Sequence, residues 1–267
     1  MRTVGYVNGD PNSLYITFQY NKLNYLIYEQ SMVTSASDAT LIDGQGTGFA
    51  LLTTIKNYAK AINPKIKVLC SLIGGNWSVF DEGHLTAIMA NATYRATLAT
   101  NLAGLVTTYG LDGVDIDWEG TDINQAQYHA LLDALRTAMP TKIITCAMPS
   151  APEYQPAIDY AFWLNPADDG ALIDGFNVMS YGLSVVNYEA YVGQYITNSF
   201  PLSKVNAGYS SVEDDIDLID EKVAWAKANS FGGQMLWTVD TVTDSEALLN
   251  KIYLNMAPAL SGSGTGC

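Results

Sequence analysis

Leu111-Asp112-Gly113-Val114-Asp115-Ile116-Asp117-Trp118-Glu119 is the stretch that decides the fold of this 267-residue chain. The side chains of a β-strand point alternately to its two faces. Asp115, Asp117 and Glu119 therefore share one face of the predicted strand, and the large apolar side chains between them share the other. An apolar face of this kind packs against helices, which turns the carboxylates into the interior of a closed sheet. Packed barrel interiors favour Val, Ile and Leu, so three acids in this place indicate a function.

Short β-like runs and longer helical patterns alternate on both sides of this stretch. We predict strands over residues 3–8, 24–29, 66–73, 111–117, 142–148, 174–180, 204–209 and 233–238. We predict helical segments that include 48–62, 84–109, 124–139 and 213–229. This alternation is typical of βαβ units and a parallel sheet. Eight such units in a chain of this length favour an α/β fold closed as a (β/α)8 TIM barrel over an open doubly wound sheet.

A single domain accounts for the chain. No linker divides it, so we expect one (β/α)8 catalytic domain over residues 1–260. Residues 261–267 are rich in Gly and Ser and predict a flexible tail. The seventh predicted strand ends near Tyr209 and the eighth begins near Gly233, which leaves room for one loop and one helix. We therefore expect no inserted α+β subdomain between these strands.

The charge of the chain excludes some classes of partner. Acidic residues outnumber basic ones, 27 to 13, for a net charge of −14. This charge repels phosphate backbones and anionic membrane surfaces, so we expect neither nucleic acid nor a membrane as a partner. Asp115-x-Asp117-x-Glu119-Gly120 begins like an EF-hand calcium loop, but Ala126 stands where that loop needs a bidentate Glu. We therefore expect no metal and no cofactor.

Glu119 ends the predicted strand, at the face of a barrel where active sites lie. Like charges crowded together raise each other's pKa, so this group of acids need not be fully ionised at neutral pH. A carboxyl that is kept protonated in this way can act as a general acid. We therefore predict that Glu119 is a catalytic acid.

Four short motifs follow one another along the predicted strands. A D-x-x-D-x-D-x-E motif is matched at Asp112, Asp115, Asp117 and Glu119. An S-x-G-G motif on strand three is matched by Ser71-Leu72-Ile73-Gly74-Gly75, a Met-x-Tyr motif on strand six by Met179-Ser180-Tyr181, and a strand-eight tryptophan by Trp237. With these elements in order on strands three, four, six and eight, most of the chain resembles glycoside hydrolase family 18, the family of chitinases and chitinase-like proteins. It departs from that family at Gly182, because Asp or Asn often follows the strand-six tyrosine there.

The resemblance implies a retaining mechanism in which the substrate's own N-acetyl group is the nucleophile. Glu119 would protonate the leaving oxygen, Asp117 would bind the acetamido N–H, and Asp115 would hold Asp117. Tyr181 would hold the acetamido carbonyl, and Trp237 would form the floor of the sugar site by stacking. Further substrate-binding residues are expected at Met179, Gly75, Tyr6 and Trp77. For Tyr6 and Trp77, as for Tyr28, lining a sugar groove stays open beside simple packing or surface exposure.

The resemblance favours a chitinase that cleaves β-1,4 linkages of N-acetylglucosamine polymers, with an open cleft and endo-type cleavage. Two alternatives stay open: an endo-β-N-acetylglucosaminidase acting on N-glycan cores, and a non-catalytic chitin-binding, lectin-like protein. The second alternative conflicts with Glu119, since such relatives usually lose this glutamate. We expect a monomer that binds an oligo- or polysaccharide containing N-acetylglucosamine. Its expected place is extracellular, although no signal peptide precedes the first predicted strand, and an intracellular place is the alternative.

Overall fold

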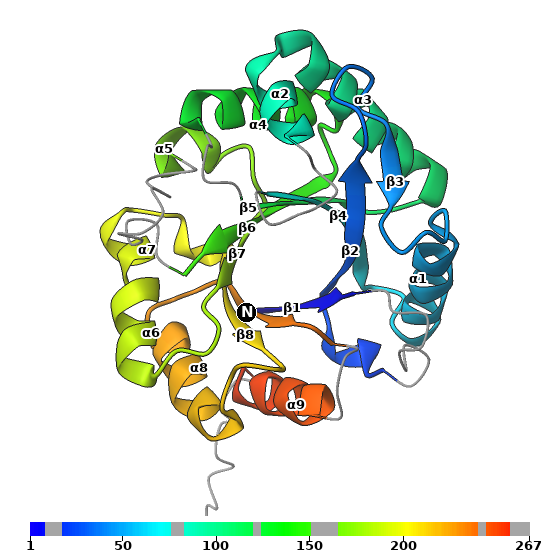
Figure 1. Cartoon of the computed structure of the whole chain (residues 1–267). Coiled ribbons are helices and arrows are strands. Elements are labelled where there is room, and N and C mark those ends of the chain that lie inside the picture. Colours follow the sequence, from blue (N-terminus) through cyan, green and yellow to red (C-terminus); the bar gives the residue numbers. More distant parts are fainter. Residues whose placement is uncertain (9–17, 76–82, 120–123, 151–164, 240–243, 257–267) are drawn as a thin grey trace, which may run out of the picture.

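Eight parallel strands closed into a barrel form the centre of the molecule (Figure 1). The computed structural model describes residues 1–8, 18–75, 83–119, 124–150, 165–239 and 244–256, and all elements below lie within them. The barrel strands are β1 (Arg2–Val7), β2 (Tyr25–Val33), β4 (Lys67–Gly75), β5 (Gly113–Glu119), β6 (Ile143–Pro149), β7 (Gly175–Met179), β8 (Val205–Ser210) and β9 (Gly233–Trp237). β1 pairs in parallel with both β2 and β9, which closes the ring. The predicted (β/α)8 fold is confirmed, and each predicted strand overlaps an observed one.

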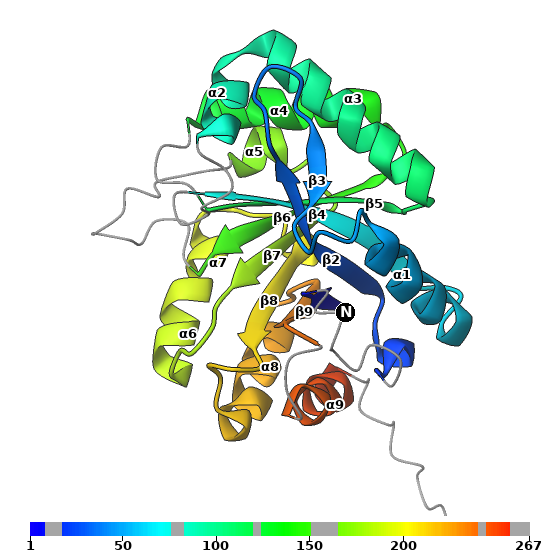
Figure 2. The ribbon, with the colours of Figure 1, turned by 45° about the vertical axis from the view of Figure 1, so that its right-hand side comes forward.

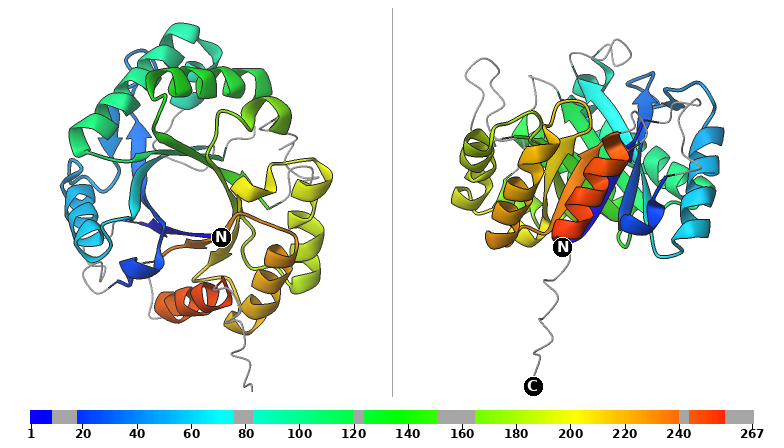
Figure 3. Two further views of the ribbon diagram at one scale, coloured as in Figure 1. Left: turned by 180° about the vertical axis from the view of Figure 1, so that it is seen from behind. Right: turned by 90° about the horizontal axis from the view of Figure 1, so that it is seen from below.

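Helices cover the outside of the barrel, as Figure 3 shows from behind and from below. They are α1 (Ala50–Ile62), α2 (His84–Ala90), α3 (Ala92–Tyr109), α4 (Gln125–Ala138), α5 (Pro166–Asp169), α6 (Val185–Val192), α7 (Gln194–Thr197), α8 (Ile219–Ala228) and α9 (Asp244–Met256), with 3-10 turns η1 (Tyr20–Lys22), η2 (Leu202–Lys204) and η3 (Ile216–Leu218). The predicted helical segment 84–109 is two helices, because Asn91 ends α2 and caps α3. Its side chain accepts hydrogen bonds from the backbone N–H groups of Thr93 and Tyr94.

The sequence pattern does not predict β3 (Leu41–Asp43), a short strand antiparallel to the end of β2 (Figure 2). Its last residue, Asp43, is buried and accepts a hydrogen bond from the Tyr28 hydroxyl at 2.9 Å. The same carboxylate accepts the backbone N–H groups of Thr47 and Phe49, so it orders the turn that leads into α1. A strand this short has no periodicity that a sequence pattern can detect.

The two faces of β5 pack as their alternation predicts. Val114, Ile116 and Trp118 lie in the main apolar core between the strands and the helices. Inside the barrel a smaller apolar cluster consists of Val4, Tyr6, Ile27, Leu69 and Met235. Asp115 and Asp117 are buried on the inner side of the sheet, above that cluster in the direction of the strand. The barrel is therefore filled by apolar side chains below and by acids toward its C-terminal end.

The connection between β8 and β9 is short. Residues 211–232 contain η3 and α8 and no strand, so no α+β subdomain lies between these two strands. α8 packs beside α9 on the outside of the barrel (Figure 3). In the described part of the chain, no helix has the length and apolar character needed to cross a membrane. The predicted tail, 261–267, lies outside the described residues.

Two glycines allow a test of how tightly the barrel is packed. A Cβ on Gly113, at the start of β5, would lie 1.9 Å from the backbone oxygen of Ile143, whereas a Cβ on Gly104 in α3 would meet nothing within 4 Å. We expect Gly113→Ala to lower the free energy of unfolding by at least about 3 kcal/mol, because backbone must move to admit the methyl group. Gly104→Ala should instead raise it by about 0.5–1 kcal/mol. Urea titrations of both variants measure this, and a Gly113→Ala protein as stable as the wild type would contradict it.

Candidate active site

Asp115 lies at the centre of a hydrogen-bonded network inside the barrel. Strand register places Ser71, Asp115 and Thr145 side by side on β4, β5 and β6. Asp115 Oδ2 accepts from the Tyr6 hydroxyl at 3.0 Å and from the Ser71 hydroxyl at 2.9 Å. Oδ1 accepts from the Thr145 hydroxyl and, at 3.3 Å, from the Asn177 amide. Burial raises the pKa of Asp115, although all of these donors favour its ionised form.

Asp117, two residues further along β5, faces the same interior and is only 6% exposed. Its Oδ1 atom has no hydrogen-bond partner among the described residues. Burial raises the pKa of Asp117 well above its ordinary value, and the nearby carboxylates of Glu119, Glu29 and Asp115 raise it further. Since buried polar atoms are nearly always paired, this oxygen is available to a donor on a bound ligand.

Glu119 ends β5 and is paired in register with Gly75 at the end of β4. It is half-buried at the C-terminal edge of the barrel, where barrel active sites lie. Burial raises the pKa of Glu119, so its carboxyl keeps a proton to a higher pH than an exposed glutamate does. Among the described residues no group of three or more His, Cys, Asp or Glu side chains could hold a metal ion. A half-buried carboxyl with a raised pKa, such as that of Glu119, is suited to proton transfer.

Tyr181 and Trp237 form a stacked aromatic pair beside the acids, with ring centroids 5.7 Å apart and planes inclined by 19°. Both are half-buried and, with Met179, pack on the apolar cluster inside the barrel. The indole N–H of Trp237 donates to Glu29 Oε2 at 2.9 Å. The Tyr181 hydroxyl contacts the Met235 sulfur at 3.6 Å. A thioether is a weak acceptor, so this hydroxyl can turn toward a better one.

The remaining predicted groove residues divide between the site and the core. Tyr6 is 2% exposed, which favours support of Asp115 over contact with a sugar. Tyr28 is buried in the outer core and hydrogen-bonded to Asp43, so it does not line a groove. Trp77 lies outside the described residues. The pair Gly74 and Gly75 stands one residue further from Ser71 than S-x-G-G requires, yet Ser71 still reaches Asp115.

Two acids near the site are missed by the sequence reasoning. Glu29 is 9% exposed at the site's edge, held by the Trp237 indole. The alternation of β2 carries a signal for it, because Tyr28 faces outward and its neighbour must face inward. Glu213 lies on the loop before α8, beside Gly182, whereas the sequence pattern assigns it to the helix start. No local pattern marks Glu213, since its place depends on how β7 and β8 lie together.

Fold and site together define a (β/α)8-barrel protein with a row of carboxylates in its mouth. The family model of glycosyl hydrolases family 18 matches residues 2–213, and the chain belongs to this family. Chitinase 1 of Aphanocladium album is 29% identical over 134 residues, which are 46% of this chain and 29% of that protein. The chain thus spans less than a third of the length of this relative.

Solved structures show the same fold. A plant class V chitinase mutant from Cycas revoluta, in complex with (GlcNAc)3, superposes with a TM-score of 0.84 at 14% identity, over 96% of this chain and 100% of that one. The chitinase-like agglutinin RobpsCRA from Robinia pseudoacacia superposes with a TM-score of 0.79 at 16% identity, over 95% of this chain and 99% of that one. The first is a chitinase and the second an agglutinin, so the fold by itself does not separate catalysis from sugar binding.

Asp117 Oδ1, which is buried and has no partner within the described residues, lowers the stability of the fold. Asp117→Asn should raise the free energy of unfolding at pH 7 by about 1–3 kcal/mol, and Tm by a few degrees, because no buried charge remains. The folded-state pKa of Asp117 is raised, so the wild type loses this stability as pH rises from about 4 through the folded pKa. The gain of the variant should therefore shrink as pH falls toward about 4. Calorimetry of both proteins at several pH values measures this difference in stability.

Asp112 provides the matched control on the same segment. Burial opposes its ionisation, but Lys60 and Lys67, with the backbone N–H of Val68, outweigh that effect, and the pKa of Asp112 is lowered. Asp112→Asn should therefore reduce Tm at pH 7, with the loss shrinking as pH falls through the lowered folded pKa. If both variants lose stability, Asp117 is an ordinary structural acid.

Proposed function

We propose that this protein is a chitinase, which hydrolyses β-1,4 linkages between N-acetylglucosamine units with retention at the anomeric carbon. The observation that carries this proposal is the buried Oδ1 of Asp117, which has no hydrogen-bond partner in the described part of the chain and lies two residues from a half-buried Glu119. A carboxylate oxygen that can accept the acetamido N–H and a carboxyl that can give a proton are the two groups that substrate-assisted cleavage needs.

In the proposed first step, Glu119 gives its proton to the glycosidic oxygen as the bond to the anomeric carbon breaks. The acetamido carbonyl oxygen of the same sugar attacks that carbon and forms a cyclic oxazolinium ion. Asp117 accepts the acetamido N–H and stabilises its growing positive charge through electrostatic preorganisation. Water then attacks the anomeric carbon from the opposite side, and Glu119, now a carboxylate, takes the proton of that water. Two inversions give net retention.

The neighbouring residues support these roles. Asp115 is fixed by its donors next to Asp117, and its charge contributes to the raised pKa of Asp117. Within the described residues the Tyr181 hydroxyl contacts a thioether, a weak acceptor, so it is available to the acetamido carbonyl. Trp237, with its indole N–H fixed by Glu29, presents a ring on which a sugar can stack.

Relatives support the substrate class. Chitinase 1 of Aphanocladium album and the Cycas revoluta enzyme are both named chitinases, and the latter binds (GlcNAc)3. An endo-β-N-acetylglucosaminidase would use the same chemistry on N-glycan cores and is the rival enzymatic function. A lectin-like role, suggested by the Robinia agglutinin, gives no reason for a half-buried Glu119 with a raised pKa.

The short connection between β8 and β9 supports an open cleft. Without a subdomain over residues 211–232, a chain segment can enter from the side, so we propose endo-type cleavage with little processivity. The acids that the mechanism uses all come from one chain, so we propose that the protein works as a monomer. Because a polysaccharide of this kind is met outside the cell, we propose an extracellular place of action.

Incubation with chitotetraose and, separately, with a high-mannose glycopeptide tests the proposed substrate. We expect cleavage of chitotetraose, with the β-anomer released first in proton NMR, and little release of glycan. Glu119→Gln should keep the fold and lower the rate by about 10²–10⁴-fold, the usual contribution of general acid catalysis. Near-wild-type turnover by this variant, or initial release of the α-anomer, would exclude the mechanism. Cleavage of the glycopeptide alone would establish the rival function.

Glu29 provides a test of the electrostatics. Its charge raises the pKa of Asp117, so Glu29→Gln should lower that pKa and move the acid limb of the kcat/KM profile to lower pH. The glutamine oxygen can still accept the Trp237 indole N–H, so KM should change little. Glu29→Ala should shift the same limb and also raise KM, because the indole loses its acceptor. An unchanged pH profile in both variants would contradict this prediction.

A further inference from the structure

Gly182 directly follows Tyr181, and Glu213 lies beside it, in van der Waals reach of the position that a Cβ would take. Gly182 has φ +62°, the left-handed region that favours glycine. A Cβ there would lie 3.4 Å from Glu213 Oε2 and 3.5 Å from Glu213 Cβ. Where the family often carries Asp or Asn after the strand-six tyrosine, this chain therefore places a carboxylate from a different strand connection. That carboxylate lies close enough to Tyr181 to help raise its pKa, after burial and the acids Asp117, Glu29 and Glu119.

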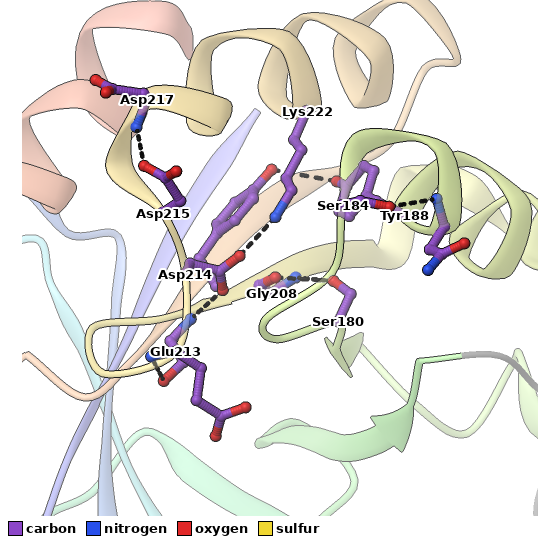
Figure 4. Close-up of polar contacts among 12 residues, drawn as sticks. Ser180, Ser184, Tyr188, Gly208, Glu213, Asp214, Asp215, Asp217 and Lys222 are labelled. Atoms are coloured by element: carbon purple, nitrogen blue, oxygen red, sulfur yellow. Dashed lines mark hydrogen bonds and ion pairs between the residues drawn. The ribbon is translucent and has the colours of Figure 1, made fainter.

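A buried ion pair fixes the loop that carries Glu213 (Figure 4). Asp214 accepts from Lys222 Nζ at 2.6 Å and from the backbone N–H of Ser210 at 2.8 Å, and both charged side chains are fully buried. The Lys222 ammonium also lies 5.7 Å from the centre of the Tyr188 ring. Breaking one partner from a buried pair is strongly unfavourable, so the loop is held in place next to Glu213.

Glu213 itself faces the other way. Its backbone N–H donates to Ser210 Oγ at 3.2 Å, and Figure 4 shows its side chain pointing away from Lys222. The side chain is exposed, and no Lys or Arg of the described residues forms an ion pair with it. All Lys and Arg of the chain lie within the described residues. Glu213 is therefore a negative charge without a Lys or Arg partner, on a loop that the neighbouring Asp214–Lys222 pair holds beside Gly182.

The segments that join each barrel strand to the next helix also lack basic residues in the sequence. From β2 onward they are 34–49, 76–83, 120–124, 150–165, 180–184, 211–218 and 238–243, and none contains Lys or Arg, although acids recur in them. Segments that join helix to strand contain Lys65, Lys142 and Lys204. A neutral polysaccharide gains nothing from such an excess of acidic residues, whereas a cationic chain is attracted to it.

We propose that Glu213 is a specificity-determining residue that binds the ammonium group of a glucosamine unit, so that the preferred substrate is partially deacetylated chitin. This proposal rests on the chitinase function proposed above. The sugar whose bond is cleaved must keep its acetyl group, because that group is the nucleophile. The glucosamine therefore occupies a neighbouring position along the chain, next to Tyr181 and Gly182. Asp117 Oδ1, which has no partner among the described residues, would bind the acetylated unit, and Glu213 would bind the deacetylated one.

The ammonium group of a glucosamine unit is a favourable partner for the Glu213 carboxylate. A charge-assisted hydrogen bond from an ammonium to a carboxylate is stronger than one between neutral groups. Because Glu213 is exposed, the gain is limited to that of a surface ion pair. Such a pair weakens in high salt, since mobile ions screen it. The preference should therefore be moderate and salt-dependent.

The test compares Glu213→Gln with the wild type on chitohexaose and on soluble chitosan that mixes acetylated and deacetylated units. On chitosan, kcat/KM should fall by about threefold to tenfold at low salt, and on chitohexaose it should stay nearly unchanged. High salt should remove the difference between the two proteins. Mass-spectrometric sequencing of the chitosan products should show glucosamine enriched at one position beside the cleaved bond, and the enrichment should disappear in the variant.

Asp133→Asn is the matched control, because it removes one negative charge from an exposed site on α4. Asp133→Asn should leave kcat/KM on both substrates and the product pattern unchanged. If Glu213→Gln lowers kcat/KM equally on both substrates, or leaves the product pattern unaltered, the role of Glu213 is overturned while the chitinase function stands. Failure of the wild type to cleave chitohexaose would instead overturn the proposed function.

Discussion

The burial of Asp115 inside a closed barrel is the constraint on which the rest of the site depends. A carboxylate in such a place is unfavourable unless hydrogen-bond donors surround it. Here the donors come from four other strands: Tyr6 on β1, Ser71 on β4, Thr145 on β6 and Asn177 on β7. Four polar side chains of the barrel interior thus donate to one carboxylate. Together they hold that carboxylate in place.

The position of Asp115 sets the properties of the acids that follow it. Asp117 lies further along the same inner face, and its buried oxygen has no donor among the described residues. Its pKa is raised by burial and by the carboxylates around it. An arrangement that satisfies one acid and leaves the next unsatisfied is poor for stability and useful for binding a ligand with an N–H group. A loss of stability in favour of binding is typical of functional sites.

The two ends of the barrel treat acidic residues in opposite ways. At the N-terminal end, Asp112 is paired with Lys60 and Lys67, and Asp174 with Arg136, so these carboxylates tie helices to strands. At the C-terminal end, Glu119 has its pKa raised by burial and lies among other acids. The same residue type therefore stabilises the fold at one end and, in the proposed mechanism, transfers the proton at the other. The environment decides between the two roles.

The sequence by itself determined the barrel, its eight strands and the acids of β5. Strand alternation is a local property, so the inward direction of Asp115 and Asp117 follows from their spacing alone. Tertiary structure decided which side chains meet across strands. Glu29 on β2 reaches Trp237 on β9 past the intervening strand β1, and Glu213 lies beside Gly182 because a buried ion pair fixes its loop. These contacts join residues far apart in the chain, and their geometry depends on the closure of the sheet, which no periodicity encodes.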